Sequence, residues 1–155
     1  MSGTTLAPAE LLALLCAHEQ AMRDLYEAFA QAYPLHAAVW NGIAREEQVH
    51  AGWIQQILHL VESGAVVLSK PAITAQAINI TRRSMERTAA KARAGQLSER
   101  EACTYAVDIE HAMIEDRYFA FLHTGPGPHA HLVQALERET SIHKAKIEAH
   151  LSDLK

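Results

Sequence analysis

A repeated three- and four-residue spacing of apolar residues constrains this chain most, and it recurs in four long segments. Such spacing places the residues along one side of an α-helix, where they form a stripe that packs against neighbouring helices. We call these stripes the seams. Their members are Leu15, Glu19, Met22, Tyr26, Phe29 and Tyr33; Trp40, Ile43, Glu47, His50, Ile54, Ile57 and Val61; Cys103, Val107, Glu110, Ile114, Arg117 and Phe121; and Val133, Leu136, Thr140, His143, Ile147, His150 and Leu154. Each seam carries polar residues near its middle, which predicts a helical bundle with polar side chains inside it.

Proline and glycine divide the chain into five predicted helices. Pro34 must end the first helix, because proline cannot continue one. Gly95 occupies a C-terminal capping position, and Ser98 with Glu101 forms a capping box at the start of the next helix. The predicted helices cover residues 8–33, 35–63, 71–94, 98–124 and 129–153.

The lengths of the helices and joins predict the architecture. Helices of about 25 residues reach nearly 40 Å at roughly 1.5 Å per residue, so four of them match well enough to form a bundle. The short joins at Pro34 and at the Gly-Pro string 124–128 predict two antiparallel hairpins. The stretch 64–97 is too long for a tight turn, and its helix has a weaker apolar stripe. We therefore expect one all-α domain over residues 1–155, a four-helix bundle with an extra helix in the long crossover.

Composition excludes several classes of protein. With 49% hydrophobic and 21% charged residues among 155, the chain is an ordinary globular protein, and its net charge of -4 argues against nucleic-acid binding. The apolar stretch 11–16 is too short to span a membrane. Cys16 and Cys103 form no C-x-x-C pair, which leaves no zinc ribbon or disulfide framework. We expect a cytoplasmic protein that binds neither nucleic acid nor membranes.

Carboxylates and histidines occupy the middle of the seams. Glu19, Glu47 and Glu110 lie on three different helices, where an unpaired buried carboxylate costs several kcal/mol. His50 follows Glu47 by three residues and so shares its face of the helix, and the last helix supplies His143. Inward carboxylates combined with Glu-x-x-His are typical of di-iron or di-manganese bundles. Carboxylate and imidazole ligands suit Fe or Mn better than a metal that prefers thiolates.

At these positions the chain resembles the rubrerythrin branch of the ferritin-like family. The matching residues are Glu19, Tyr26, Phe29 and Ala30 in the first helix; Trp40, Ala44, Glu47 and His50 in the second; and Glu110 and Tyr118 in the third bundle helix. The resemblance implies two bound iron ions, with Mn or Zn as alternatives, that react with peroxide or dioxygen. It also implies a catalytic role near the metal for Tyr26 and Tyr118, although both also suit a core position. Only two cysteines are present, so the four-cysteine iron domain of full-length rubrerythrin is missing and a separate electron-donor protein is expected.

The last helix departs from the family pattern. Thr140 stands where the second Glu-x-x-His would have its Glu, and Glu139 stands one residue earlier. Residues four apart share a helix face, so Glu139 could reach a metal beside His143. Met113 stands where the family often has a further Glu. The sequence therefore leaves one, two or no bound metal ions open.

Two other functions compete with an iron enzyme. One is a degenerate bundle that serves for dimerisation or protein binding, with its seam carboxylates held by Arg117 and by each other. The other is a hemerythrin-like dioxygen carrier, for which only His111-x-x-x-Glu115 fits the required motifs. We expect a homodimer, the commonest oligomer. The remaining histidines are expected at the surface or in helix caps: His18, His36, His59, His111, His123, His129, His131 and His150.

Overall fold

The computed structural model describes residues 6–69, 73–115, 118–123 and 125–154, and these residues form helices and loops without any strand. This confirms the all-α prediction. The helices are α1 (Pro8–Ala32), α2 (Ala37–Glu62), α3 (Ala75–Arg93), α4 (Glu99–Glu115) and α5 (Ala130–Asp153), with short 3-10 helices at Pro34–His36 and Ala120–Leu122. Within the described part of the chain, no helix is long and apolar enough to cross a membrane.

Most helix ends lie at the residues whose local chemistry predicts them. Gly64 and Gly95 follow α2 and α3 with φ of 77° and 70°, a left-handed conformation that favours glycine. The backbone N–H of Ser98 donates to Glu101 Oε2 at 2.8 Å, and the N–H of Glu101 donates to Ser98 Oγ at 3.2 Å. The predicted capping box is therefore formed and begins α4.

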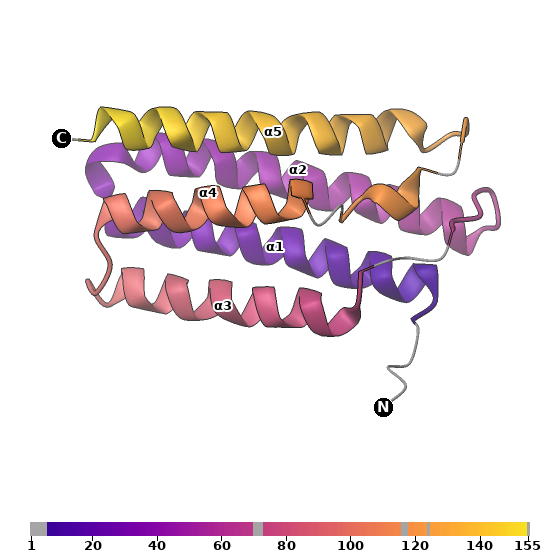
Figure 1. Ribbon diagram of the computed structural model, residues 1–155, viewed down its shortest axis with the longest axis horizontal. Helices are drawn as coiled ribbons and strands as arrows, with labels where there is room; N and C mark the ends of the chain where they lie inside the picture. The colour runs from indigo at the N-terminus through magenta and orange to yellow at the C-terminus, as the bar shows by residue number, and fades with distance from the viewer. Residues whose placement is uncertain (1–5, 70–72, 116–117, 124, 155) are drawn as a thin grey trace.

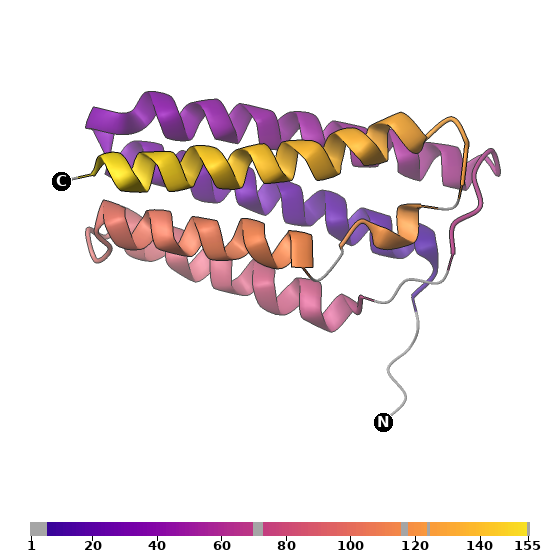
Figure 2. The ribbon, with the colours of Figure 1, turned by 45° about the horizontal axis from the view of Figure 1, so that its top comes forward.

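The helices lie side by side along one long axis (Figures 1 and 2). α1 and α2 form one antiparallel hairpin, and α4 and α5 form the other. α3, which joins the two hairpins in the chain, runs back along the length of the molecule at its edge and packs against α1. The predicted helix in the crossover is present. Only Ile78, Met85, Ala89 and Ala92 of α3 are buried, as expected for its weaker stripe.

The fourth predicted helix is too long. α4 ends at Glu115 rather than near residue 124, and a 3-10 helix follows at Ala120–Leu122. Tyr118, Phe119, Phe121 and Leu122 are all buried, although a continuous helix would turn such close neighbours toward different faces. The break lets all four enter the core. Arg117, predicted in this seam, lies outside the described residues, and Ile114 is 39% exposed.

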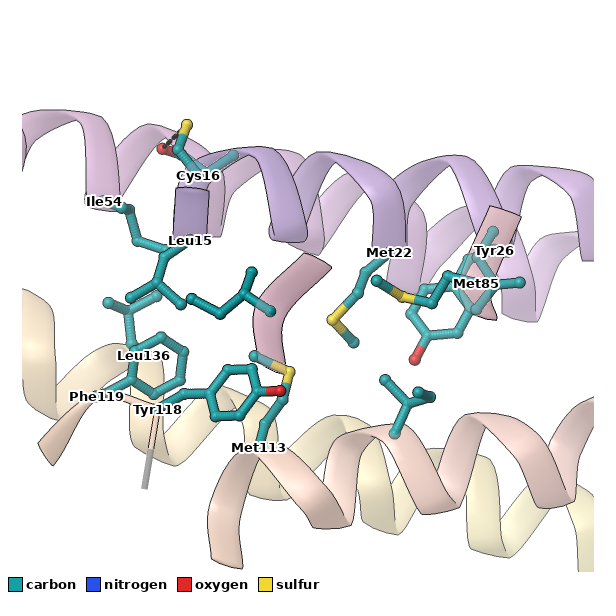
Figure 3. Close-up of a cluster of buried hydrophobic side chains, with 14 of the residues drawn as sticks. Leu15, Cys16, Met22, Tyr26, Ile54, Met85, Met113, Tyr118, Phe119 and Leu136 are labelled. Atoms are coloured by element: carbon teal, nitrogen blue, oxygen red, sulfur yellow. Dashed lines mark hydrogen bonds between the residues drawn. The ribbon is translucent and has the colours of Figure 1, made fainter. Parts of the chain in front are cut away.

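The seams otherwise face the interior as predicted. Buried apolar side chains occupy the space between the helices, among them Leu15 and Met22 from α1 and Met113 from α4 (Figure 3). Tyr26 of α1 and Met85 of α3 are also buried among these side chains. The apolar layers enclose the polar middle of the seams and keep water away from it.

Candidate metal centre

Five of the six predicted metal ligands meet in the middle of the bundle. They are Glu19 from α1, Glu47 and His50 from α2, Glu110 from α4 and His143 from α5. Each is at most 2% exposed. Four helices thus bring three carboxylates and two imidazoles into one water-poor space.

Glu47 lies at the centre of this group. Its Oε1 is 2.8 Å from Nδ1 of His143, and its Oε2 is 3.0 Å from Nδ1 of His50. The two imidazole rings stack on each other with their centroids 4.9 Å apart. One carboxylate therefore connects the two histidines of α2 and α5.

The other two carboxylates extend the group at both ends. Glu19 Oε2 lies 3.9 Å from Nδ1 of His50, and Glu110 Oε1 lies 3.6 Å from Nδ1 of His143. The Tyr26 hydroxyl donates a 2.7 Å hydrogen bond to Glu110 Oε1. The result is a row in which carboxylates and imidazoles alternate, and we call this row, Glu19, His50, Glu47, His143 and Glu110, the buried centre.

Burial and crowded charges shift the pKa values of the carboxylates apart. Burial, together with the negative charge of Glu47, raises the pKa of Glu19 well above its ordinary value and that of Glu110 to about 7. Burial alone would raise the pKa of Glu47 too, but hydrogen bonds with His143 and His50 hold it well below its usual range. Glu47 is therefore the ionised carboxylate of the centre.

His143 holds a proton in the metal-free protein. Burial would lower its pKa, but its contacts with Glu110 and Glu47 raise that pKa to about 10. At neutral pH His143 and Glu19 are therefore protonated. These protons reduce the repulsion between three neighbouring carboxylates that have no cation beside them.

The residues present fit a metal ion. Ligand atoms of Glu47, His50 and His143 all lie within 4.8 Å of one another. Glu19 Oε2 is buried without a hydrogen-bond partner in the described part of the chain, so this oxygen has an unused lone pair. Among the described residues no Lys or Arg forms an ion pair with Glu19, Glu47 or Glu110. These residues could therefore hold a divalent cation.

Glu139 lies apart from the centre. Its side chain is 25% exposed, and its Oε1 is 3.9 Å from Nε of Arg138. Thr140 is buried, but its hydroxyl donates to the Leu136 carbonyl of its own helix at 2.8 Å. Among the described residues, neither side chain forms a hydrogen bond or ion pair with the other five candidate ligands.

The two tyrosines also lie in different places. Tyr26 touches the buried centre through Glu110. Tyr118 is buried, and its ring packs edge-on against His18 with centroids 5.3 Å apart. Its hydroxyl lies 3.4 Å from that of Thr81 on α3. The structure therefore brings Tyr26, and not Tyr118, to the candidate ligands.

Sequence reasoning missed Glu46. Its Oε2 lies 2.9 Å from Nε2 of His143, and Lys146 holds the same carboxylate at 2.8 Å. Such an outer carboxylate orients the ring of a ligating histidine. The only signal in the sequence is that Glu46 directly precedes Glu47.

Two histidines predicted at the surface or in caps, His18 and His150, are buried instead, and His129 is buried at the N-cap position of α5. His18 directly precedes Glu19, and α1 is covered by both α2 and α3, so more than one face of α1 turns inward. Burial lowers the pKa of His18 to about 4, which leaves the ring neutral. His111, the candidate hemerythrin-like ligand, is exposed.

In three comparisons with known proteins, the chain matches no protein-family model, no curated protein and no solved structure.

Proposed function

We propose that this protein is a ferritin-like metalloprotein that binds iron at the buried centre and reacts with peroxide or dioxygen. The observation that carries the proposal is the alternation of three buried carboxylates with two imidazoles, with no lysine or arginine to neutralise them among the described residues. The resemblance of the first two helices to rubrerythrin and the helix in the long crossover support the same assignment.

Each residue of the buried centre has a role in this proposal. Glu47, which connects both histidines, would hold the metal together with Glu19 and Glu110 at the two ends of the row. His50 and His143 would be the nitrogen ligands. Two ferrous ions supply two electrons together, which allows a peroxide to be reduced without release of a radical.

Residues around the buried centre contact its ligands and limit the access of water. Burial, with the charge of Glu110, raises the pKa of Tyr26 well above its usual value, so its hydroxyl remains a donor that orients Glu110. Glu46 forms an ion-pair contact with the far side of the His143 ring. The apolar layers exclude bulk water, and any reductant must deliver electrons from outside the bundle.

A cavity supports access for a small oxidant. It measures about 490 Å³ and its lining includes Met113, Phe119, Thr140 and Ser141. Thr140 stands one helical turn before His143 on α5, so the cavity lies beside the α5 end of the centre. Its lining also includes the ion pair of His123 and Glu137, so it combines apolar surface with a pair of charged side chains.

The alternative is a degenerate bundle that acts as a dimerisation or protein-binding module. The position of Glu139 favours it, because α5 then contributes only one ligand from the pair expected there. In that case protons on Glu19 and His143 alone would neutralise the centre.

Metal analysis of protein purified without chelator separates the two functions. The proposal predicts between about one and two Fe, Mn or Zn per chain at the buried centre, and this metal is lost in the double variant Glu47→Ala and His50→Ala. The variant His59→Ala, which removes an exposed histidine from the same helix, should keep its metal. Less than about a tenth of an equivalent in the wild type, even after anaerobic addition of ferrous iron, would rule out the metalloprotein.

A further inference from the structure

A second cluster of potential metal ligands lies at the end of the bundle, away from the buried centre. We propose that His36, Glu99 and His150 form a binding site for Zn²⁺. His36 ends the 3-10 helix before α2, Glu99 begins α4, and His150 lies in the last turn of α5. The two sites share no ligand, so this proposal does not depend on the proposed iron chemistry.

The distances suit a small divalent ion. His36 Nδ1 is 2.7 Å from Glu99 Oε2, and His150 Nε2 is 2.8 Å from Glu99 Oε1. The three ligand atoms of the cluster lie within 4.8 Å of one another. In a tetrahedral zinc site with bonds of 2.0–2.2 Å, ligand atoms lie roughly 3.3 Å apart. Small rotations of these side chains would therefore admit the ion.

Aromatic neighbours hold the three side chains in place. Trp40 Nε1 donates a 3.0 Å hydrogen bond to Glu99 Oε1, which orients the carboxylate. The His150 ring packs edge-on against Trp40 and against His36, with centroids 5.7 and 4.8 Å apart. Fixed outer partners of this kind raise the metal affinity of a site, because the ligands lose little freedom on binding.

Burial and chemistry define the kind of site. The His150 side chain is 8% exposed and that of Glu99 15%, whereas that of His36 is 40% exposed. Glu99 and His150 thus lie on the inner side of the site, and the site is open to water on the side of His36. Two imidazoles, one carboxylate and an open position for water are the ligand set of mononuclear zinc sites.

Calorimetric titration with Zn²⁺ tests the site. The full-length variant with Glu47→Gln and His50→Gln removes central ligands of the buried centre, and it should still bind about one Zn²⁺ per chain. Adding His36→Ala should weaken this binding by about 100-fold or more, since two ligands remain of three. His36 is partly exposed, so its loss should not prevent folding. Adding His59→Ala instead, which removes an exposed histidine of α2, should leave the affinity unchanged.

Nitrogen NMR of the imidazole rings provides a second measurement in the wild type, which does not depend on the double variant folding. Addition of Zn²⁺ should shift the ring nitrogens of His36 and His150 but not those of His59. Equal zinc affinity with His36→Ala and with His59→Ala, or unshifted ring signals for His36 and His150, would overturn the proposal. The cluster would then be an ion-paired contact between helix ends.

Discussion

Glu47 Oε1 and His143 Nδ1 lie 2.8 Å apart although 96 residues separate them in the chain. This contact links the two hairpins at a point where both side chains are buried. It also explains the opposite pKa shifts of its members, since each stabilises the charged form of the other. The behaviour of the centre therefore depends on the packing of α2 against α5.

Metal binding should release protons and become tighter as the pH rises. In the metal-free protein the pKa of His143 is raised to about 10, that of Glu19 well above its ordinary value and that of Glu110 to about 7. At pH 7 a metal ion must therefore displace protons from His143 and Glu19, and the fraction of a proton that Glu110 carries. Calorimetry in buffers of different ionisation enthalpy measures the number released, and we expect more than one per chain. A heat of binding independent of the buffer would contradict this protonation state.

Replacing Glu139 tests whether α5 supplies a carboxylate to the metal. Glu139 lies beside Arg138 and not at the centre, so Glu139→Ala should leave the metal content unchanged and alter stability by no more than about 0.5 kcal/mol. Thr140→Glu places a carboxylate at the buried position one turn before His143, and it should maintain or raise the metal content. Loss of about one equivalent of metal in Glu139→Ala would show instead that this side chain moves to the metal when it binds.

Tyr26→Phe should affect the centre, and Tyr118→Phe should not. The first change leaves Glu110 without its 2.7 Å donor and should lower the free energy of unfolding by about 2 kcal/mol. It should also weaken binding of the metal ion nearest Glu110. Tyr118 is equally buried but touches His18 and Thr81, so its variant is the matched control. Identical metal affinities in the two variants would argue against a role for Tyr26.

His18→Leu should stabilise the metal-free protein. The imidazole is fully buried, and neither ring nitrogen has a hydrogen-bond partner among the described residues, so an apolar side chain should raise the free energy of unfolding by about 1–2 kcal/mol. Chemical denaturation at pH 7 measures the change. His131→Leu, at an exposed position on α5, is the control and should show no such gain.

The same pair of variants should differ in their response to acid. Burial lowers the pKa of His18 from 6.5 to about 4, so between these values the unfolded chain takes up a proton that the folded chain does not. Above pH 6.5 this difference in proton uptake does not affect the free energy of unfolding. As the pH falls from 6.5 to 4, it lowers the free energy of unfolding by up to about 3 kcal/mol. His18→Leu should lose less stability than His131→Leu across this window. Parallel pH profiles would show that His18 is protonated in the folded protein.

The helices and the inward-facing residues could be predicted from the sequence because both depend on local spacing. Pro34, Gly95 and the Ser98–Glu101 box mark helix ends through the backbone geometry of a few neighbouring residues. A three-residue step places Glu47 and His50 on one face of any α-helix, whatever packs against it. Spacing does not fix where α4 ends, because burial of the aromatic residues after Glu115 depends on the space left by the other helices.

Contacts between helices depend on the rotation and depth of each helix, which only the tertiary structure decides. Glu139 and Thr140 are neighbours, so a small rotation of α5 about its axis decides which of the two faces the core. In the packed bundle Thr140 and His143 face inward, and Glu139 lies at the edge. The same packing brings Glu46 against His143 and gathers His36, Glu99 and His150 at the end of the bundle. These residues lie far apart in the chain and share no periodic pattern, so their meeting follows from the assembled bundle and not from any single helix.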